Sequence, residues 1–497
     1  MTRWIAAVVV SLLALDASAA LPDFFEIETG WISGMALDGD SALRAYLGLP
    51  YAEAPVGELR WKPPAPPPTF DALYEAIEYG PACAQTPFAE GSFWENLNEE
   101  LDEDCLYLNV WTEAATPDDK RPVMVWIHGG AFTRGSGAWP RYDGAALAQK
   151  GVVVVTLNYR LGVFGFLAHP ALNAESEDGV SGNYAILDQI AALRWVQRNI
   201  GTFGGDPDNV TIFGESAGSW AVSALLAAPS ANGLYHRAIG QSGAFLGDMA
   251  SLAEASTQGA SLLSELGAND AAAMRTLPVA RLLEAAGAPG AFSARPIFDG
   301  HVFPDVVGDV FRAGGQARVS VLLGSNADEG TAFPTALRDS FLANVEKSNP
   351  GFLDTYPEDD EDGSARALLD AFRDGMFTCP MRQWADASEN AYLYYFTRAP
   401  LHAERERYGA YHGSDISYVF RTLDARAFSA DETDDALAET MSSYWVNFAT
   451  TGDPNGDGLP PWPAYTTDGG AYLELGDDVR SRSHLNREAC DFLEVSR

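Results

Sequence analysis

The sequence predicts an α/β fold in which a large, mostly parallel β-sheet is covered by helices on both faces. Continuous apolar runs recur along the chain, which is typical of strands buried on both faces. A run with helical spacing of its apolar residues, 187–199, lies between two of them. A Gly-x-Ser-x-Gly sequence stands where a strand-like run meets a helix-like run. Strands that alternate with helices in this way form parallel sheets.

The individual elements follow from these runs in chain order. Apolar and β-branched runs bounded by Gly, Pro and Asp predict strands, and Ala/Leu-rich runs predict helices. We also expect helical insertions that cap the sheet, within 250–286 and near 330–380. The predicted elements are a small hairpin sheet in 24–47, irregular Pro-rich chain at 51–68, strands at 106–111, 122–127, 151–158, 210–213, 238–240, 319–323 and 391–397, and helices at 187–199 and 217–226.

Length and charge limit the classes of function. The chain has 497 residues, enough for two to four average domains, although an α/β domain of this kind can take the whole length. We expect residues 20–497 to form one domain. The formal net charge is −37 and only four lysines occur, so the protein should repel nucleic acid and anionic membranes. The acidity could favour cationic substrates or could serve solubility in salt. The oligomeric state is not predicted.

The first 19 residues have the pattern of a signal peptide. Arg3 supplies the positive charge, 4–15 is apolar, and Ala17-Ser18-Ala19 is a small-x-small cleavage sequence. No later stretch is long and apolar enough to span a bilayer, so we expect no stable membrane anchor. We therefore expect a secreted or periplasmic protein.

Four cysteines occur, Cys83, Cys105, Cys379 and Cys490. An even number in an exported chain predicts two disulfides, for which three pairings are possible. Cys83–Cys105 closes the short local loop and would leave Cys379–Cys490 as the second bond. No cysteine pair has the tight spacing of metal ligands, so we expect no metal and no cofactor.

Ser216 is the candidate nucleophile. It stands in Gly214-Glu215-Ser216-Ala217-Gly218, between the strand-like 210–213 and the helix-like 217–226. A sharp strand-to-helix turn strains the backbone and projects the serine hydroxyl, and glycines on both sides let strand and helix pack closely. The next backbone N–H, that of Ala217, lies at the helix N-terminus beside it. This is the geometry required for acyl transfer.

A serine nucleophile needs a base and an acid, which in α/β hydrolases follow it in the order acid, then histidine. Among the later histidines we favour His412, because Gly413 beside it permits a tight loop. The acid should follow the strand at 319–323. Both Asp328 and Glu329 stand in that loop, and the order of residues leaves the choice between them open.

Further motifs make the chain similar to the type-B carboxylesterase and cholinesterase family of α/β hydrolases, along nearly all of residues 20–497. The motifs are Glu103-Asp104-Cys105-Leu106-Tyr107-Leu108-Asn109, Trp126-Ile127-His128-Gly129-Gly130-Ala131-Phe132, Asn158-Tyr159-Arg160, Phe203-Gly204-Gly205-Asp206-Pro207, Phe213-Gly214-Glu215-Ser216-Ala217-Gly218, Gln241-Ser242-Gly243 and Tyr444-Trp445-Val446-Asn447-Phe448-Ala449.

The resemblance implies roles for particular residues. It selects Glu329 as the acid and agrees with His412 as the base. It implies an oxyanion hole built from the N–H groups of Gly130, Ala131 and Ala217, and the same two disulfides as above. It also implies a polar group of Glu215, Ser242 and Asp415 behind the triad, and structural ion pairs Arg60–Glu103 and Arg160–Asp188.

The substrate pocket is where the chain departs from cholinesterases. There an aromatic cage binds the choline ammonium by cation–π attraction. Trp94 could form its floor, but Ala332 stands where a second aromatic is expected, followed by Phe333. The acyl-pocket segment, 289–298, keeps Phe292 but has Gly290 at a position where an aromatic residue would narrow the pocket. With Phe132, these residues indicate a roomy pocket for general, aryl, or short-to-medium acyl esters.

The sequence therefore predicts a serine carboxylesterase that acts on a small-molecule ester through an acyl-enzyme on Ser216. Alternatives within the enzymes are a cholinesterase-like activity, a lipase with a lid over the Cys83–Cys105 loop, and an amide or carbamate hydrolase. The alternative from another class is a non-catalytic recognition protein of the same fold. It is disfavoured because all three triad positions are occupied by suitable residues.

Overall fold

The structure, a computed structural model, describes residues 21–37, 42–88, 100–356, 363–401, 405–425 and 429–495. The expected signal peptide, 1–19, and the expected pocket residue Trp94 lie outside these ranges.

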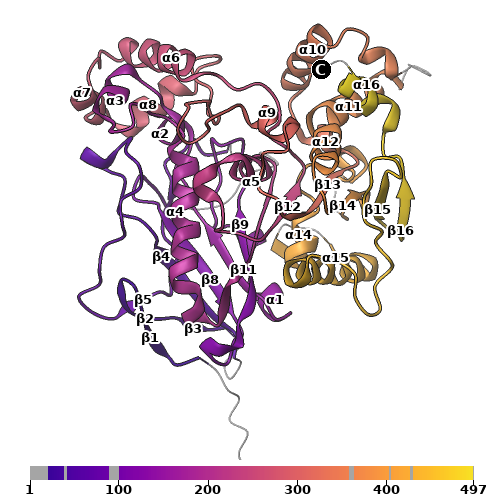
Figure 1. The fold of residues 1–497 in the computed structure, drawn as a ribbon, viewed down its shortest axis with the longest axis horizontal. Helices are drawn as coiled ribbons and strands as arrows, with labels where there is room; N and C mark the ends of the chain where they lie inside the picture. Colours follow the sequence, from indigo (N-terminus) through magenta and orange to yellow (C-terminus); the bar gives the residue numbers. More distant parts are fainter. Residues whose placement is uncertain are drawn as a thin grey trace, which may run out of the picture.

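A large sheet forms the centre of the molecule (Figure 1). The strands from β10 across to β15 are mutually parallel, while β8, β4 and β3 at one edge and β16 at the other pair antiparallel to their neighbours. This confirms the predicted mostly parallel sheet. In spatial order the strands are β16 (Val479–Ser483), β15 (Ala471–Leu475), β14 (Ala391–Phe396), β13 (Ser320–Asn326), β12 (Arg237–Gln241), β11 (Gly205–Glu215), β9 (Arg121–Ile127), β10 (Val153–Leu157), β8 (Tyr107–Thr112), β4 (Arg44–Pro50) and β3 (Met35–Ala36).

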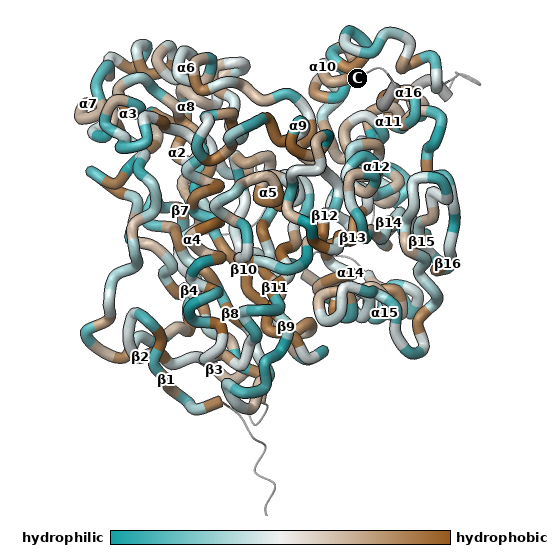
Figure 2. The backbone as a smooth tube through the Cα atoms, in the orientation of Figure 1, coloured by the Kyte–Doolittle hydropathy of each residue, from teal (hydrophilic) through white to brown (hydrophobic). Residues whose placement is uncertain are grey.

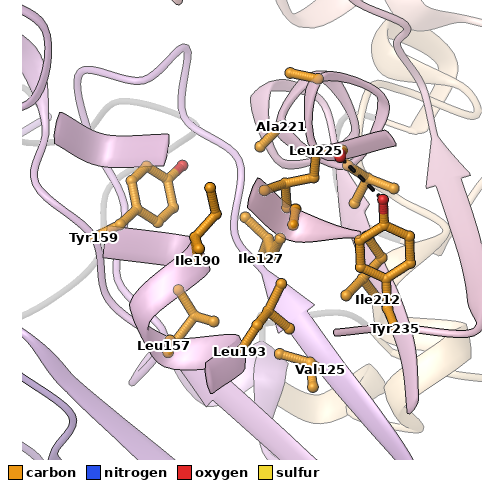
Figure 3. Packing of buried hydrophobic residues seen from close by; sticks show 14 of the residues in the cluster. Val125, Ile127, Leu157, Tyr159, Ile190, Leu193, Ile212, Ala221, Leu225 and Tyr235 are labelled. Carbon is orange, nitrogen blue, oxygen red and sulfur yellow. Dashed lines mark hydrogen bonds between the residues drawn. The ribbon is translucent and has the colours of Figure 1, made fainter. Parts of the chain in front are cut away.

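Helices bury both faces of the sheet, so the inner parts of its central strands are mostly apolar on both sides. In β9, Val125 and Ile127 face a cluster formed with α4 (Tyr184–Asn199) and α5 (Ala217–Ala227). The alternate residues, Met124 and Trp126, face a second cluster formed with α1 (Ala145–Ala148), α14 (Ile416–Phe420) and α15 (Glu432–Thr451). Successive strand residues point to opposite faces, which explains the continuous apolar runs. Figure 3 shows the first cluster, and Figure 2 the apolar centre of the chain.

The remaining helices gather beyond one end of the sheet in two groups, seen at the top of Figure 1. One group packs around its own apolar cluster below α6 to α8, and the other around a cluster that includes the C-terminal helix α16. These helices are α2 (Gly162–Phe166), α3 (Pro170–Glu175), α6 (Leu252–Glu265), α7 (Ala271–Arg275), α8 (Val279–Ala286), α9 (Val307–Arg312), α10 (Thr335–Ser348), α11 (Gly363–Arg373), α12 (Cys379–Asp386), α13 (Arg405–Tyr408) and α16 (Arg487–Val495). The helices α6 to α8, α10 and α11 fall within the predicted insertions at 250–286 and near 330–380, whereas α2, α3, α9, α13 and α16 lie outside those ranges.

The N-terminal region differs from the sequence prediction of one small hairpin sheet over 24–47. Only β1 (Phe24–Ile27) and β2 (Gly30–Ser33) form a small sheet, with β5 (Tyr74–Glu75) as third strand. The strand β4 joins the large sheet instead, because it is buried almost throughout and pairs with β8. A further pair, β6 (Ala82–Cys83) and β7 (Leu101–Asp102), flanks the first disulfide.

Within the described ranges, no helix combines the length and the apolar character that a transmembrane span requires.

Candidate active site

Ser216 stands at a sharp turn between β11 and α5. Its backbone has φ +57° and ψ −123°, a strained conformation for a residue with a side chain. A Cβ added to Gly218 would lie 2.0 Å from the carbonyl oxygen of Ile127, and one on Gly214 would lie 2.6 Å from the same oxygen. Only glycine therefore lets the strand and the helix approach β9 this closely, as the sequence pattern predicted.

The histidine loop and the acid loop meet at the carboxyl ends of the parallel strands. His412 Nδ1 lies 2.6 Å from Glu329 Oε2, and both side chains are buried. The other carboxylate oxygen of Glu329 accepts a hydrogen bond from the backbone N–H of Asn326 at 2.8 Å. The carboxylate is thus fixed by the end of β13 and oriented on one ring nitrogen of His412.

Asp328, which sequence order alone left as an alternative acid, has other partners. Its Oδ1 binds Arg366 at 2.6 Å and its Oδ2 accepts the backbone N–H of Ala410 at 2.8 Å. The structure thus brings Glu329, and not Asp328, onto His412.

The turn that follows β9, Gly129 to Ala131, lies close to Ser216. A Cβ on Gly129 would lie 3.1 Å from the Cβ of Ser216. Gly130 and Ala131 have φ +109° and +56°, so successive peptide groups are turned away from the strand direction. A Cβ on Gly130 would lie 2.1 Å from the carbonyl oxygen of Arg134, which makes glycine obligatory there.

His128 anchors this turn from beneath. The hydroxyl of Tyr159 donates to the His128 carbonyl at 2.7 Å, and the two rings stack with centroids 4.4 Å apart. Burial lowers the pKa of His128 to about 4, so its ring is neutral at physiological pH. The neutral ring leaves His412 as the titrating histidine beside Ser216.

Glu215 gives the site a second carboxylate. Its Oε1 lies 3.2 Å from His412 Nε2, so His412 stands between Glu215 and Glu329. Burial raises the pKa of Glu215 to about 7. Burial also opposes the charged form of His412, but the carboxylates of Glu215 and Glu329 outweigh it and raise its pKa to about 9. The site is therefore built to stabilise an imidazolium.

Asp415 and Ser242, which the resemblance implied as a polar group of the site, are both buried at the carboxyl end of β12. Asp415 accepts hydrogen bonds from Gln241 Nε2 and the Tyr394 hydroxyl, both at 2.8 Å, and from Asn326. Burial raises its pKa. Ser242 has φ +56°, and its hydroxyl has no hydrogen-bond partner among the described residues. In the described part of the chain, no group of three or more His, Cys, Asp or Glu side chains could hold a metal ion.

Two phenylalanines contact the ring of His412. The centroid of Phe333, an expected pocket residue, lies 4.9 Å from that of His412. Phe377, which the sequence analysis missed, lies 4.7 Å away. It stands in the π-helical turn Asp374–Thr378 directly before Cys379, a turn type frequent at functional sites. No pattern along the chain marks Phe377 as a residue of the site.

Of the other expected pocket residues, the structure describes Phe132 and Phe292. Phe132 is fully buried, and its ring centroid lies 6.2 Å from that of Trp220, which is one helical turn after Ser216. Phe292 is half-buried and packs against the apolar cluster of the cap.

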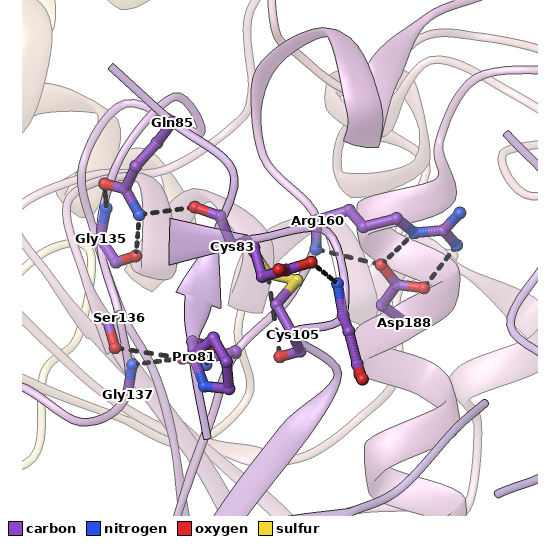
Figure 4. The surroundings of a disulfide bond; sticks show 12 residues. Pro81, Cys83, Gln85, Cys105, Gly135, Ser136, Gly137, Arg160 and Asp188 are labelled. Atoms are coloured by element: carbon purple, nitrogen blue, oxygen red, sulfur yellow. Dashed lines mark hydrogen bonds and ion pairs between the residues drawn. A yellow bond between two sulfur atoms is a disulfide. The ribbon is translucent and has the colours of Figure 1, made fainter. Parts of the chain in front are cut away.

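Both predicted disulfides are present, Cys83–Cys105 and Cys379–Cys490. Figure 4 shows the first, where Gln85 links the Cys83 carbonyl to Gly135 in the turn after β9. The expected ion pairs are present as well. Arg160 Nη2 lies 2.6 Å from Asp188 Oδ1, and Arg60 Nε lies 2.7 Å from Glu103 Oε2. These contacts hold the chain on one side of the site.

The comparison with known proteins agrees with this geometry. The model of the carboxylesterase family matches residues 22–493. This chain belongs to the carboxylesterase family. As in other carboxylesterases, the α/β-hydrolase fold places the strand-to-helix serine above the carboxyl ends of the parallel strands.

Individual carboxylesterases resemble it over most of their length. The fumonisin B1 esterase of Sphingopyxis macrogoltabida is 38% identical over 92% of this chain and 87% of its own. The para-nitrobenzyl esterase of Bacillus subtilis is 35% identical over 88% and 92%. A crystal structure of a Geobacillus stearothermophilus carboxylesterase superposes with a TM-score of 0.83 at 35% identity, covering 95% of this chain and all of that one. The chain is a carboxylic ester hydrolase.

Proposed function

We propose that Ser216, His412 and Glu329 are the catalytic triad of this esterase. The observation that carries the proposal is the hydrogen bond between His412 Nδ1 and the buried carboxylate of Glu329, whose other oxygen accepts a second hydrogen bond from the backbone. It comes together with a serine held at φ +57° on the strand-to-helix turn. Because Glu329 binds Nδ1, we assign the proton exchange with Ser216 and the substrate to Nε2, the nitrogen that also faces Glu215.

The reaction runs in two halves. His412 Nε2 takes the proton of the Ser216 hydroxyl while Oγ attacks the ester carbonyl carbon. The backbone N–H groups of Gly130, Ala131 and Ala217 stabilise the oxyanion. When the carbon–oxygen bond to the alcohol breaks, His412 gives its proton to the leaving oxygen. Water, deprotonated by His412, then attacks the acyl-enzyme and releases the acid and Ser216.

Glu215 and Glu329 stabilise the imidazolium that forms in each half. Both carboxylates lie within about 3.2 Å of a ring nitrogen of His412. We propose that Asp415 and Ser242 support this arrangement from behind, Asp415 by fixing Asn326 and Gln241.

For substrates, we propose general, aryl or short-to-medium acyl esters. The positions that narrow a cholinesterase pocket carry Ala332 and Gly290 here. Two relatives are named as a fumonisin B1 esterase and a para-nitrobenzyl esterase, and the second name agrees with an ester that carries an aromatic ring. We also propose that residues 1–19 are a signal peptide and that the mature enzyme is secreted or periplasmic, which the two disulfides support.

Replacement of the nucleophile tests the proposal. We expect Ser216→Ala to lower kcat/KM for p-nitrophenyl butyrate by at least about 10³-fold with an unchanged melting temperature, because the acyl-enzyme cannot form. Ser230→Ala, an exposed serine beyond α5, is the matched control and should keep full activity. The substrate panel adds p-nitrophenyl acetate and octanoate, a p-nitrobenzyl ester and acetylthiocholine.

If Ser216→Ala hydrolyses the esters at the wild-type rate, Ser216 is not the nucleophile and the proposed triad is wrong. Strong turnover of acetylthiocholine would favour the cholinesterase-like alternative, and activation by an emulsified ester would favour the lipase. Absence of hydrolysis by the wild-type protein would favour the recognition protein.

A further inference from the structure

An arginine lies close to the proposed nucleophile without a carboxylate partner. The guanidinium carbon of Arg295 is 5.2 Å from the centroid of the Trp220 ring, a cation–π contact. Trp220 follows Ser216 by one turn of α5, and its backbone N–H donates to the Ser216 carbonyl at 2.9 Å. Arg295 therefore contacts the side chain of a residue in the first turn of the helix that begins after Ser216.

Arg295 makes no ion pair and no side-chain hydrogen bond with any of the described residues. Arg60 and Arg160, at the rim of the same end of the sheet, are each fully engaged by a carboxylate. An unpaired arginine is unexpected in a protein of net charge −37. Its guanidinium keeps five N–H donors in a planar fork that fits a carboxylate.

Arg295 is exposed to solvent but belongs to a segment whose backbone is anchored on both sides. Its side chain is exposed to solvent, yet burial by neighbouring protein atoms lowers its pKa. Its flanks are anchored on both sides, because the backbone of Ile297 exchanges two hydrogen bonds with Asn183, each 2.9 Å, and the N–H of Ser293 donates to Gln258. The guanidinium is thus held in place and open to a ligand.

The position of Arg295 relative to the triad indicates which part of a bound ester Arg295 would face. His412 must lie beside the leaving alcohol, since it protonates that oxygen, and Phe333 and Phe377 surround His412. Trp220 instead packs against Phe132, on the turn that carries the oxyanion donors. Arg295 therefore approaches Ser216 on the acyl side of the ester.

Resting on the proposed role of Ser216, we propose that Arg295 binds a carboxylate carried by the acyl group, so that the preferred substrates are monoesters of dicarboxylic acids, whose second carboxylate is free. The net charge of the protein repels such anions at long range, but at physiological salt charges beyond about 8 Å are largely screened. A fixed, partly desolvated arginine within the site therefore determines the local preference.

Three benzyl esters test this. Monobenzyl glutarate carries a carboxylate on the acyl side, 4-carboxybenzyl pentanoate carries it on the alcohol side, and benzyl pentanoate carries none. For the wild-type enzyme at constant salt, kcat/KM should be highest for monobenzyl glutarate. Arg295→Gln should lower kcat/KM for that ester about tenfold or more, mainly through KM, and leave the other two within about twofold.

Two further variants separate binding from structure. Arg295→Lys keeps the charge but not the planar fork, and should restore part of the lost activity on monobenzyl glutarate. Arg318→Gln removes an exposed arginine, paired with Glu389, that precedes β13 at the amino ends of the parallel strands, and should change none of the three rates.

The inference is wrong if Arg295→Gln lowers all three esters equally, which would mean that it only supports Trp220, or if monobenzyl glutarate is unaffected. It is also wrong if the wild-type enzyme hydrolyses benzyl pentanoate but not monobenzyl glutarate, a result that leaves the triad intact. Hydrolysis of none of the esters overturns the proposed function, and this inference with it.

Discussion

His412 is the residue on which the chemistry converges, because two carboxylates approach its two ring nitrogens. Against its own burial, the carboxylates of Glu215 and Glu329 raise the pKa of His412 to about 9, and burial raises the pKa of Glu215 to about 7. Two such close groups titrate as a pair. A histidine with a pKa of about 9 is mostly protonated at neutral pH, so only a small fraction of the enzyme holds it as the free base that activates Ser216.

Glu215→Gln tests this balance. Above pH 7, where Glu215 is charged, the substitution removes one negative charge beside His412, so the imidazolium is less stable and the pKa of His412 falls. The acidic limb of the profile of kcat/KM against pH should move to lower pH by about one unit, and the plateau should fall. The measurement is a pH–rate profile with a neutral ester, with background hydrolysis subtracted.

Glu389→Gln, an exposed carboxylate far along the strand from the site, is the control and should leave the profile unchanged. If the acidic limb stays in place or moves to higher pH in Glu215→Gln, the Glu215 carboxylate does not raise the pKa of His412.

At the scale of elements, the two disulfides differ in the length of chain that they close. Cys83–Cys105 joins residues 22 apart, while Cys379–Cys490 joins residues 111 apart and fixes α16 to α12. Both cysteines of the second bond lie in one apolar cluster. Since the entropy removed from the unfolded chain grows with the closed loop, the long bond should stabilise more.

We expect the double variant Cys379→Ser/Cys490→Ser to lose about 1.4 kcal/mol more free energy of unfolding than Cys83→Ser/Cys105→Ser, from the difference in loop length alone. Urea unfolding followed by circular dichroism measures both. The short-loop variant should instead lose more activity, because Gln85 connects that bond to the turn after β9. An equal or reversed order of stability would contradict the loop argument.

At the scale of the whole molecule, the sequence predicted the central sheet best, since buried parallel strands are mostly apolar on both sides. The run 122–127 became β9 and the helix predicted at 217–226 became α5. The edge was not predicted. β16 is almost fully exposed and β15 only partly buried, so neither carries a strong apolar pattern, and only pairing in the sheet defines them.

The site was predictable where one residue type is required by local geometry. Close backbone contacts require glycine around Ser216 and after β9, and these glycines form recognisable motifs in the sequence. The choice of Glu329 over Asp328 came from the resemblance. The order of residues could not supply it, because two adjacent carboxylates in a loop differ only in the direction of their side chains in the folded protein. Phe377 and Arg295 reach the site through tertiary contacts that leave no pattern along the chain.

The most direct test of the central claim is covalent labelling with a serine-directed organophosphate. The wild-type enzyme should gain one phosphoryl group as it loses activity, and peptide mapping should place it on Ser216, because His412 activates that hydroxyl alone. The His412→Ala variant should label far more slowly. A label on another serine, or inactivation without a label on Ser216, would contradict the account.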